Sequence, residues 1–319
     1  FARLHNRAQL NDDPSLSPDD LQYSEDDILK YKEHSSPFTH PDVDWWKEVI
    51  QPNAIQQKHS LAVSGRSNDF KYFISFGYLN QEGIYRSNNL KRYNSRINID
   101  ANLTPSTTVA IGISGDVEKI SRPGTFYANE DKGVFSQLSF LPPNSFPVRN
   151  EDGTWASNDG QNPVADASME SGFRSENPLN LQSSISLNQR LDFMVKGLSL
   201  KFISAYDLGY SNYKDWFTPY LAYNNGQVLN DESLPRLFEG FGKYNNQTFE
   251  THLNYLRSFN KHDVSGLLLY TQTASYSNNI NASRTDFVSP ALPQLFAGPR
   301  TNIDNNGSAS EGGREGYLG

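Results

Sequence analysis

The chain has 319 residues, a formal net charge of −8 at pH 7, 13% aromatic residues and no cysteine. The negative charge argues against a nucleic-acid surface, and the absence of thiols excludes disulfides, thiolate metal sites and a cysteine nucleophile. No run of about 18 apolar residues is present, so we expect no membrane-spanning helix, whereas alternating membrane strands stay compatible with the sequence.

The first 58 residues are polar and rich in Asp and Pro, and we predict short helices there. Ser24 is followed by three acidic residues and then by ILKYK, which is typical of an N-cap with an acidic first helical turn. A second turn is predicted from Asp44 through Lys47. From residue 59 the pattern changes, so we divide the chain into a polar segment, 1–58, and a strand region, 59–319.

In the strand region apolar residues recur at every second position, which predicts about eight antiparallel strands. They cover residues 59–65, 70–78, 92–105, 108–120, 179–191, 198–212, 248–259 and 264–277. In the third strand Ile97 and Ile99 fall on one side, and Arg96, Asn98 and Asp100 fall on the other. In a soluble sandwich the apolar side meets a protein core, but in a membrane barrel it meets lipid while the polar side lines a lumen.

The links between the predicted strands alternate in length. Short links follow the first, third, fifth and seventh strands, at residues 66–69, 105–107, 192–197 and 260–262. Long links follow the others, at residues 80–92, 121–177, 213–247 and 279–315. Outer-membrane barrels have short turns at one end and long loops at the other, and Greek-key sandwiches have no reason to keep this alternation. The alternation therefore favours lipid as the neighbour of the apolar side.

Four motifs follow one another within residues 44–100: DWWKEV at 44–49, AVSG at 62–65, GYLNQEGI at 77–84 and RYNSRINID at 92–100. In this order they resemble the early barrel of SusC/RagA-type TonB-dependent outer-membrane transporters. Weaker similarities continue along the chain, among them NPVA at 162–165, GLSLK at 197–201 and REGYLG at 314–319. The resemblance covers essentially the whole chain.

The resemblance implies an all-β fold, an antiparallel transmembrane β-barrel segment with long extracellular loops that belongs to a larger, plugged barrel in the Gram-negative outer membrane. Nothing in the chain matches the plug, the TonB-contacting segment or the later strands of the family. Residues 317–319 also look like the beginning of a further strand. We therefore expect an interior segment of a longer protein.

The function that the resemblance implies is import without bond chemistry, so we expect no enzyme and no cofactor. The cargo would be an oligosaccharide or a peptide. The partners would be a SusD-like surface lipoprotein, membrane lipid and the TonB energising complex, the last acting through parts absent from this chain. The alternative is a complete small β-barrel or a β-sandwich that serves as an adhesin or carbohydrate-binding module.

Aromatic residues in the long links are the candidate substrate site. Trp216, Tyr220 and Tyr223 cluster in one link and Trp155 lies in another, and Phe126 and Tyr127 resemble them in setting. Aromatic faces beside amides and carboxylates suit a sugar ring or a peptide side chain. The alternative is that these rings form an interfacial girdle or pack the loops onto themselves.

The remaining candidates are polar. Arg96, Asn98 and Asp100 are predicted to face a lumen or a plug. The six histidines show neither H-x-H nor HExxH spacing, so we predict no metal site, and His252 with Glu250 is interpreted as a lumen-facing polar pair.

Overall fold

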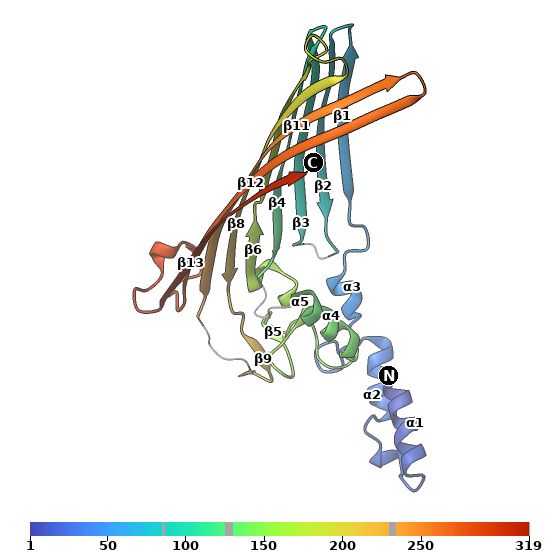
Figure 1. The fold of residues 1–319 in the computed structure, drawn as a ribbon. Helices are drawn as coiled ribbons and strands as arrows, with labels where there is room; N and C mark the ends of the chain where they lie inside the picture. Colours follow the sequence, from blue (N-terminus) through green and yellow to red (C-terminus); the bar gives the residue numbers. More distant parts are fainter. Residues whose placement is uncertain (85–86, 125–129, 230–233, 319) are drawn as a thin grey trace.

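The computed structural model describes residues 1–84, 87–124, 130–229 and 234–318, and its main feature is one ten-stranded antiparallel sheet (Figure 1). Its strands are β1 (Gln56–Arg66), β2 (Phe70–Glu82), β3 (Asn89–Thr104), β4 (Thr107–Pro123), β6 (Gly172–Glu176), β7 (Leu179–Arg190), β8 (Leu198–Phe217), β11 (Arg236–Phe259), β12 (His262–Arg284) and β13 (Ile303–Leu318). They pair in this order, and β6 and β7 in succession fill one position between β4 and β8. Within the described residues β1 and β13 are the two edges, so these strands do not close into a small barrel.

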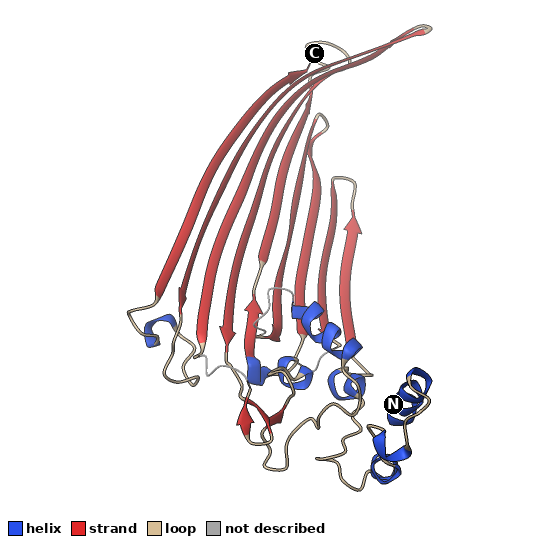
Figure 2. Cartoon of the chain, turned by 90° about the horizontal axis from the view of Figure 1, so that it is seen from below, coloured by secondary structure: helices blue, strands red, loops and turns tan. Residues whose placement is uncertain are grey.

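Helices and a small second sheet lie at one end of the main sheet (Figure 2). The helices are α1 (Ala2–Asp12), α2 (Glu25–Glu33), α3 (Trp45–Val49), α4 (Glu130–Phe140) and α5 (Pro163–Asp166), with 3-10 turns η1 (Pro18–Asp20), η2 (Met169–Ser171) and η3 (Leu295–Ala297). The small sheet contains β5 (Trp155–Ala156), β9 (Ala222–Asn224) and β10 (Gln227–Val228). In the part of the chain that the structure describes, no helix is both long and apolar enough to cross a bilayer.

Two of the helices begin at the predicted residues. The Ser24 hydroxyl accepts a hydrogen bond from the Asp27 backbone N–H at 3.1 Å, and the Asp27 carboxylate accepts one from the Ser24 N–H at 3.0 Å, which completes a capping box for α2. Asp44 caps α3 with a single hydrogen bond, in which its carboxylate accepts from the Lys47 N–H at 3.1 Å. Helix α1 was not predicted, and the division of the chain at residue 58 stays a prediction.

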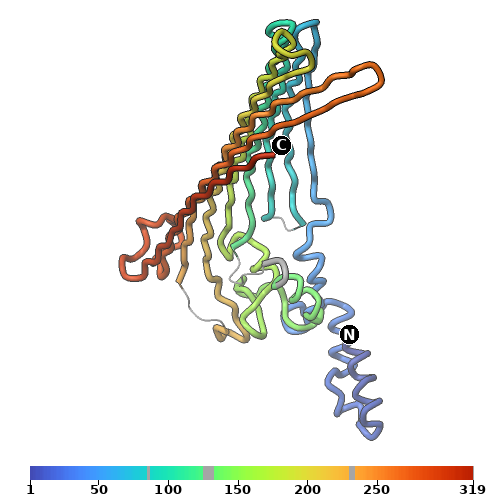
Figure 3. Tube along the Cα trace, viewed as in Figure 1, coloured from blue at the N-terminus to red at the C-terminus, as the bar shows by residue number. Residues whose placement is uncertain are grey.

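The connections alternate between the two ends of the sheet, and three of the four predicted long links are long. The link predicted at 80–92 is short, because β2 runs to Glu82 and β3 begins at Asn89. The short turns, residues 67–69, 105–106, 191–197 and 260–261, lie at the upper end of the sheet in Figure 1, and the tube in Figure 3 follows the same path. The other connections lie at the opposite end with the helices, and their described residues are 83–84 and 87–88, 124 and 130–171, 218–229 and 234–235, and 285–302. One end of the sheet is therefore formed by turns and the other by folded loops.

The predicted extents of several loops were wrong because the strands continue beyond their alternating parts. β12 runs to Arg284 and β13 occupies residues 303–318, so the predicted loop at 279–315 shrinks to 285–302. Residues 317 and 318 end this long strand instead of beginning one, and Gly319 lies outside the described residues. β13 carries polar and small residues on both sides, as in DNNGSASEGGREG at 304–316, so its backbone pairing leaves no hydropathy alternation to read.

The register gives the sheet two unlike faces. We call the face of Ile97 and Ile99 the belt face and that of Arg96, Asn98 and Asp100 the polar face. Belt-face neighbours in register with Ile97 and Ile99 include Ile74 and Tyr72 on β2 and Ile113 and Ile111 on β4. Many of these apolar side chains are exposed, for example Leu61 at 68% and Phe76 at 52%. Their exposure leaves a large apolar surface without a protein cover.

The apolar belt slants across the sheet. Three successive rungs hold apolar side chains on β2 but polar ones on β11: Tyr78, Phe76 and Ile74 against Lys243, Asn245 and Gln247. On this face of β11 large apolar side chains lie on both sides of the polar stretch: Phe249, Leu253 and Tyr255 toward the 260–261 turn, and Leu237 and Phe241 toward the loops. Strands of a barrel are tilted against its axis, so a level apolar band crosses successive strands at a changing register.

Gly172 begins β6, where the long connection after β4 returns to the sheet. Substituting this glycine tests how tightly the chain is packed at that point. Its φ is +101°, and an added Cβ would lie 1.9 Å from the Trp216 carbonyl oxygen. We expect Gly172→Ala to lower the free energy of unfolding of the complete protein by about 2–4 kcal/mol, measured by urea denaturation in detergent, because strain and overlap add. Gly153→Ala is the matched control: its φ is +85° but nothing lies within 4 Å, so we expect a loss of about 1 kcal/mol. Equal losses would contradict the close approach at Gly172.

Candidate functional site

Two of the long connections fold together at one end of the sheet. We call this unit, α3 with residues 134–171 and 218–229, the loop assembly. Its core consists of buried apolar side chains: Trp45, Val49, Val134, Leu138, Phe146, Ala156 and Ala167. The Trp45 ring lies 4.9 Å from the Phe146 ring, and its indole N–H donates to the Pro142 carbonyl at 3.1 Å. Residues before the first strand thus help to hold the loops.

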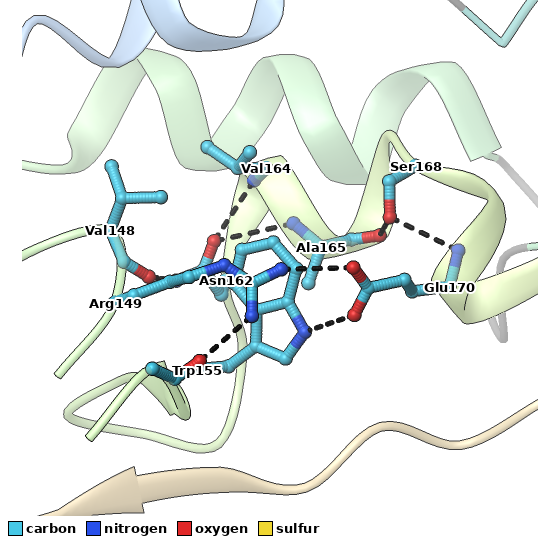
Figure 4. A network of polar contacts seen from close by, with 9 residues as sticks. Val148, Arg149, Trp155, Asn162, Val164, Ala165, Ser168 and Glu170 are labelled. Carbon is cyan, nitrogen blue, oxygen red and sulfur yellow. Dashed lines mark hydrogen bonds and ion pairs between the residues drawn. The ribbon is translucent and has the colours of Figure 1, made fainter.

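Asn162 is the polar centre of the loop assembly (Figure 4). It is fully buried, and its amide nitrogen donates to the carbonyls of Val148 at 3.0 Å and Ala156 at 2.8 Å. Its amide oxygen accepts hydrogen bonds from the N–H groups of Val164 and Ala165, which caps α5, and Pro163 occupies the first helical position. One side chain therefore satisfies four backbone groups from three segments.

Trp155 is buried against an ion pair. The Arg149 guanidinium lies 3.6 Å from the centre of its ring, and the Glu170 carboxylate accepts hydrogen bonds from the indole N–H at 2.8 Å and from Arg149 at 2.9 Å. Figure 4 shows the three side chains in contact. With 7% of its surface exposed, Trp155 stabilises the loop assembly in this structure.

Tyr220 joins the two long connections through a buried carboxyl group. Its hydroxyl donates to Asp166 at 2.8 Å and accepts from the Asn162 N–H at 2.9 Å, and Gln137 donates to the other Asp166 oxygen at 2.7 Å. Burial raises the pKa of Asp166, although the hydrogen bonds from Gln137 and Tyr220 oppose this shift. Burial and the nearby Asp166 also raise the pKa of the Tyr220 phenol.

The structure brings together three of the four predicted aromatics. Trp155 and Ala156 pair in parallel with Ala222 and Tyr223, and the Trp155 and Tyr220 rings lie 6.2 Å apart. Trp216 lies elsewhere, 3% exposed and packed edge-on against Phe287 at 4.9 Å. Tyr223 is half-buried. A substrate-binding role for the four stays a prediction, and Phe126 and Tyr127 lie outside the described residues.

The polar face presents the other predicted site residues. Arg96, Asn98 and Asp100 are all exposed there. A hollow of about 650 Å³ on this face is lined by Arg96 and by polar side chains of neighbouring strands, among them Ser75, Asp116, Asn180, Gln182 and Tyr244. Tyr244 lies across Gly209, where an added Cβ would come within 2.0 Å of its ring, and donates to Asn180 at 3.1 Å. The face therefore offers charged and amide groups, and among the described residues no group of three or more His, Asp or Glu side chains is placed to hold a metal ion.

His252 and Glu250 form the predicted polar pair. The two side chains project on the polar face of β11, and their nitrogen and oxygen lie 2.8 Å apart. Sequence reasoning missed other residues of the loop assembly: Arg149, Asn162 and Asp166 as partners of the aromatics. The Asn-Pro pair at 162–163 carried a helix-start signal, but no local pattern indicates which ring Arg149 covers.

The chain is similar in sequence to curated TonB-dependent receptors of Formosa agariphila. It is 27% identical to TonB-dependent receptor P26 over 124 residues, which is 38% of this chain and 11% of that protein. It is 24% identical to TonB-dependent receptor P39 over 280 residues, which is 79% of this chain and 25% of that protein. The chain thus spans a quarter or less of the length of these relatives. No family model matches it.

Solved structures share the fold. The RagAB peptide transporter matches with a TM-score of 0.68 and 21% identity, over 88% of this chain and 31% of the solved chain. The RagAB peptide importer in its closed-closed state also gives a TM-score of 0.68, with 19% identity over 86% of this chain and 30% of the other. These matches confirm the predicted fold class, an antiparallel barrel segment with long loops.

The raised pKa of Asp166 predicts a pH-dependent loop assembly. A carboxyl whose folded-state pKa is raised stabilises the fold most below its ordinary value of 3.8, and this stability declines as the pH rises through the raised pKa. In the complete protein we expect hydrogen exchange of amides 155–167, corrected for intrinsic rates, to become faster over this range. Asp166→Asn should flatten the slope, because an amide does not titrate. The stability involved is about 1.4 kcal/mol for each tenfold gain in the proton affinity of this carboxyl on folding.

The control is Asp152, an exposed residue of the same assembly. The Thr154 hydroxyl holds the pKa of its carboxyl below the usual value, so its contribution declines as the pH falls. Asp152→Asn should therefore leave the slope above pH 4 unchanged. A slope that survives Asp166→Asn would show that another group causes it.

Proposed function

We propose that this chain, which has the fold of a SusC/RagA-type TonB-dependent transporter barrel segment and is similar in sequence to TonB-dependent receptors, is part of an outer-membrane importer. The observation that carries the proposal is the structural match over 88% of the chain at a TM-score of 0.68. The alternation of short turns and long folded connections supports it. In this role the chain performs transport and no bond chemistry.

The two faces take different surroundings in this proposal. The belt face, with Ile97 and Ile99, contacts the lipid of a Gram-negative outer membrane, because exposed apolar side chains there have no protein cover. The polar face, with Arg96, Asn98 and Asp100, faces the lumen or a plug. The end that carries the loop assembly points outward, since outer-membrane barrels place their long connections outside the cell.

The cargo is an oligosaccharide or a peptide, and the matched solved structures are described as a peptide transporter and a peptide importer. A SusD-like surface lipoprotein would contact the loop assembly, and a TonB complex would supply energy through parts absent from this chain. Of the four predicted aromatics, Tyr223 is the best placed to contact cargo, because its side chain is half-buried and its hydroxyl makes no hydrogen bond to the described residues. Trp155 and Trp216 are buried and hold the loops.

The orientation of the faces is tested on β3. In the complete protein Ile99→Arg should destabilise the inserted state by about 2–4 kcal/mol if the side chain lies near the bilayer midplane. Asp100→Ala, one residue along and on the other face, should leave insertion nearly unchanged. The measurement is the amount of folded protein in the outer-membrane fraction and its urea midpoint in lipid vesicles. Equal tolerance at both positions would refute lipid on one side only.

Import is tested in cells that carry the complete protein or lack it. Uptake of labelled oligosaccharides and of labelled peptides should require the protein and should stop when the proton gradient of the inner membrane is collapsed. Tyr223→Ala should weaken cargo binding by about tenfold, the value of one lost aromatic contact, with normal protein levels. Trp216→Ala should instead lower the protein level, because this ring is buried. Uptake that persists without the gradient would indicate a passive pore.

A further inference from the structure

A pair of lysines lies side by side on the belt face, near the end that carries the loop assembly. Lys91 of β3 and Lys119 of β4 are directly opposite each other in the register, and both are exposed. Residues in direct register on adjacent strands have Cβ atoms about 5 Å apart, and like charges at that separation destabilise a sheet. Neither lysine forms an ion pair with any carboxylate of the described residues.

The neighbouring register pair of β3 and β4, on the polar face, consists of opposite charges. Arg92 and Glu118 follow Lys91 and Lys119 in the same ladder and project on the polar face. Their side chains form an ion pair with a nitrogen to oxygen distance of 2.5 Å. The like-charged pair is therefore confined to the face that we assign to lipid.

The other groups in the lysine row are neutral. Asn80 of β2 lies opposite Lys91, and Gln57 of β1 lies opposite Asn80. The nearest carboxylate on this face is Glu82, diagonal to Lys91, and it already accepts hydrogen bonds from the Gln51 amide at 2.8 Å and the Ile55 N–H at 3.4 Å. The row thus offers ammonium and amide donors to an anion.

An aromatic row marks the depth of the lysines. Two residues nearer the short turns, His59, Tyr78 and Tyr93 lie in register across β1, β2 and β3. The rings of His59 and Tyr78 are 6.1 Å apart, and those of Tyr78 and Tyr93 are 5.1 Å apart. Rows of aromatic rings lie at the boundary between the hydrocarbon and the polar groups of a membrane. The lysines then lie just outside the hydrocarbon, at the depth of lipid phosphates.

We infer that Lys91 and Lys119, on the loop-assembly side of the Tyr78 and Tyr93 rings, bind a phosphate-bearing lipid headgroup of the membrane leaflet on that side. A phosphate between the two ammonium groups replaces their repulsion by two charge-assisted hydrogen bonds. The acyl chains of the same lipid lie along the exposed apolar side chains of the belt face, on the short-turn side of the tyrosines. The inference rests on the proposed function, because it requires lipid on the belt face.

The test uses the complete protein in lipid nanodiscs and compares four forms. They are the native protein, Lys91→Gln with Lys119→Gln, Lys91→Arg with Lys119→Arg, and Arg92→Gln with Glu118→Gln. The readout is the amount of a phosphate-bearing anionic lipid that the protein retains against an excess of a zwitterionic lipid, measured by native mass spectrometry.

We expect the glutamine pair to lose retention by roughly tenfold or more, since each basic side chain at a membrane surface contributes to anion affinity. The arginine pair should retain the lipid, and the polar-face control should behave as the native protein does. Undiminished retention by the glutamine pair, or an equal loss in the control, would overturn the inference. Competition by millimolar inorganic phosphate would assign the site to free phosphate and would overturn the lipid assignment.

The insertion test at Ile99 separates this inference from the proposed function. If Ile99→Arg blocks insertion but the glutamine pair retains lipid, the importer orientation stands and the lipid site is refuted. If Ile99→Arg is tolerated, the belt face does not meet lipid and both proposals fail. A urea midpoint measured on every form excludes misfolding as the cause of lost retention.

Discussion

The register of the antiparallel hydrogen-bond ladder decides what every strand residue contacts. Each strand of the main sheet pairs with its neighbours over most of its length, and among the described residues the ladder has one register shift, between Asn102 and Thr104 on β3. Because side chains alternate, a slip of one residue would exchange the two faces. The same rule that separates Ile99 from Asp100 separates Lys91 from Arg92. This one register places the side chains of the apolar belt and the lysine pair on one face, and those that line the polar hollow on the other.

The slant of the belt adds a second constraint. A belt that ran along the rungs would suit strands parallel to the axis of a barrel, but here it drifts toward the short turns between β2 and β11. Tilted strands must carry their apolar segment at a shifted position so that all segments lie at one depth. The drift accounts for the polar stretch of β11 at residues 243–247, and the apolar side chains of Leu237 and Phe241 lie beyond that stretch, nearer the loops.

The long connections are stabilised differently from the strands. Their irregular backbone forms no hydrogen-bond ladder, so its N–H and C=O groups need other partners. In the loop assembly buried side chains replace the ladder: Asn162 satisfies four backbone groups, and Asp166 with Tyr220 ties one connection to the other. Two of the aromatic rings predicted as binding groups are buried and make packing contacts. Trp155 against Arg149 and Trp216 against Phe287 are examples.

Local patterns were sufficient for part of this structure. The hydropathy period of two identified eight of the ten strands of the main sheet, and Ser24 and Asp44 identified two helix starts, since each of these signals lies within a few consecutive residues. The order of short and long links along the chain indicated the two ends of the sheet. Strands β6 and β13 were missed. The unpredicted parts lacked such a signal. β13, with polar and small residues on both sides, has no period to read, and α4 forms within a stretch that packs against α3 and α5, far apart in sequence.

By itself, then, the sequence determined the alternation along each strand and the order of turns and loops, because both follow from neighbouring residues. The tertiary structure decided which strands extend, which aromatic rings are buried and which charges meet. Lys91 and Lys119 are 28 positions apart and Tyr220 and Asp166 are 54 apart. Their pairing depends on register and on loop packing, and these are properties of the whole sheet that no short stretch of sequence contains.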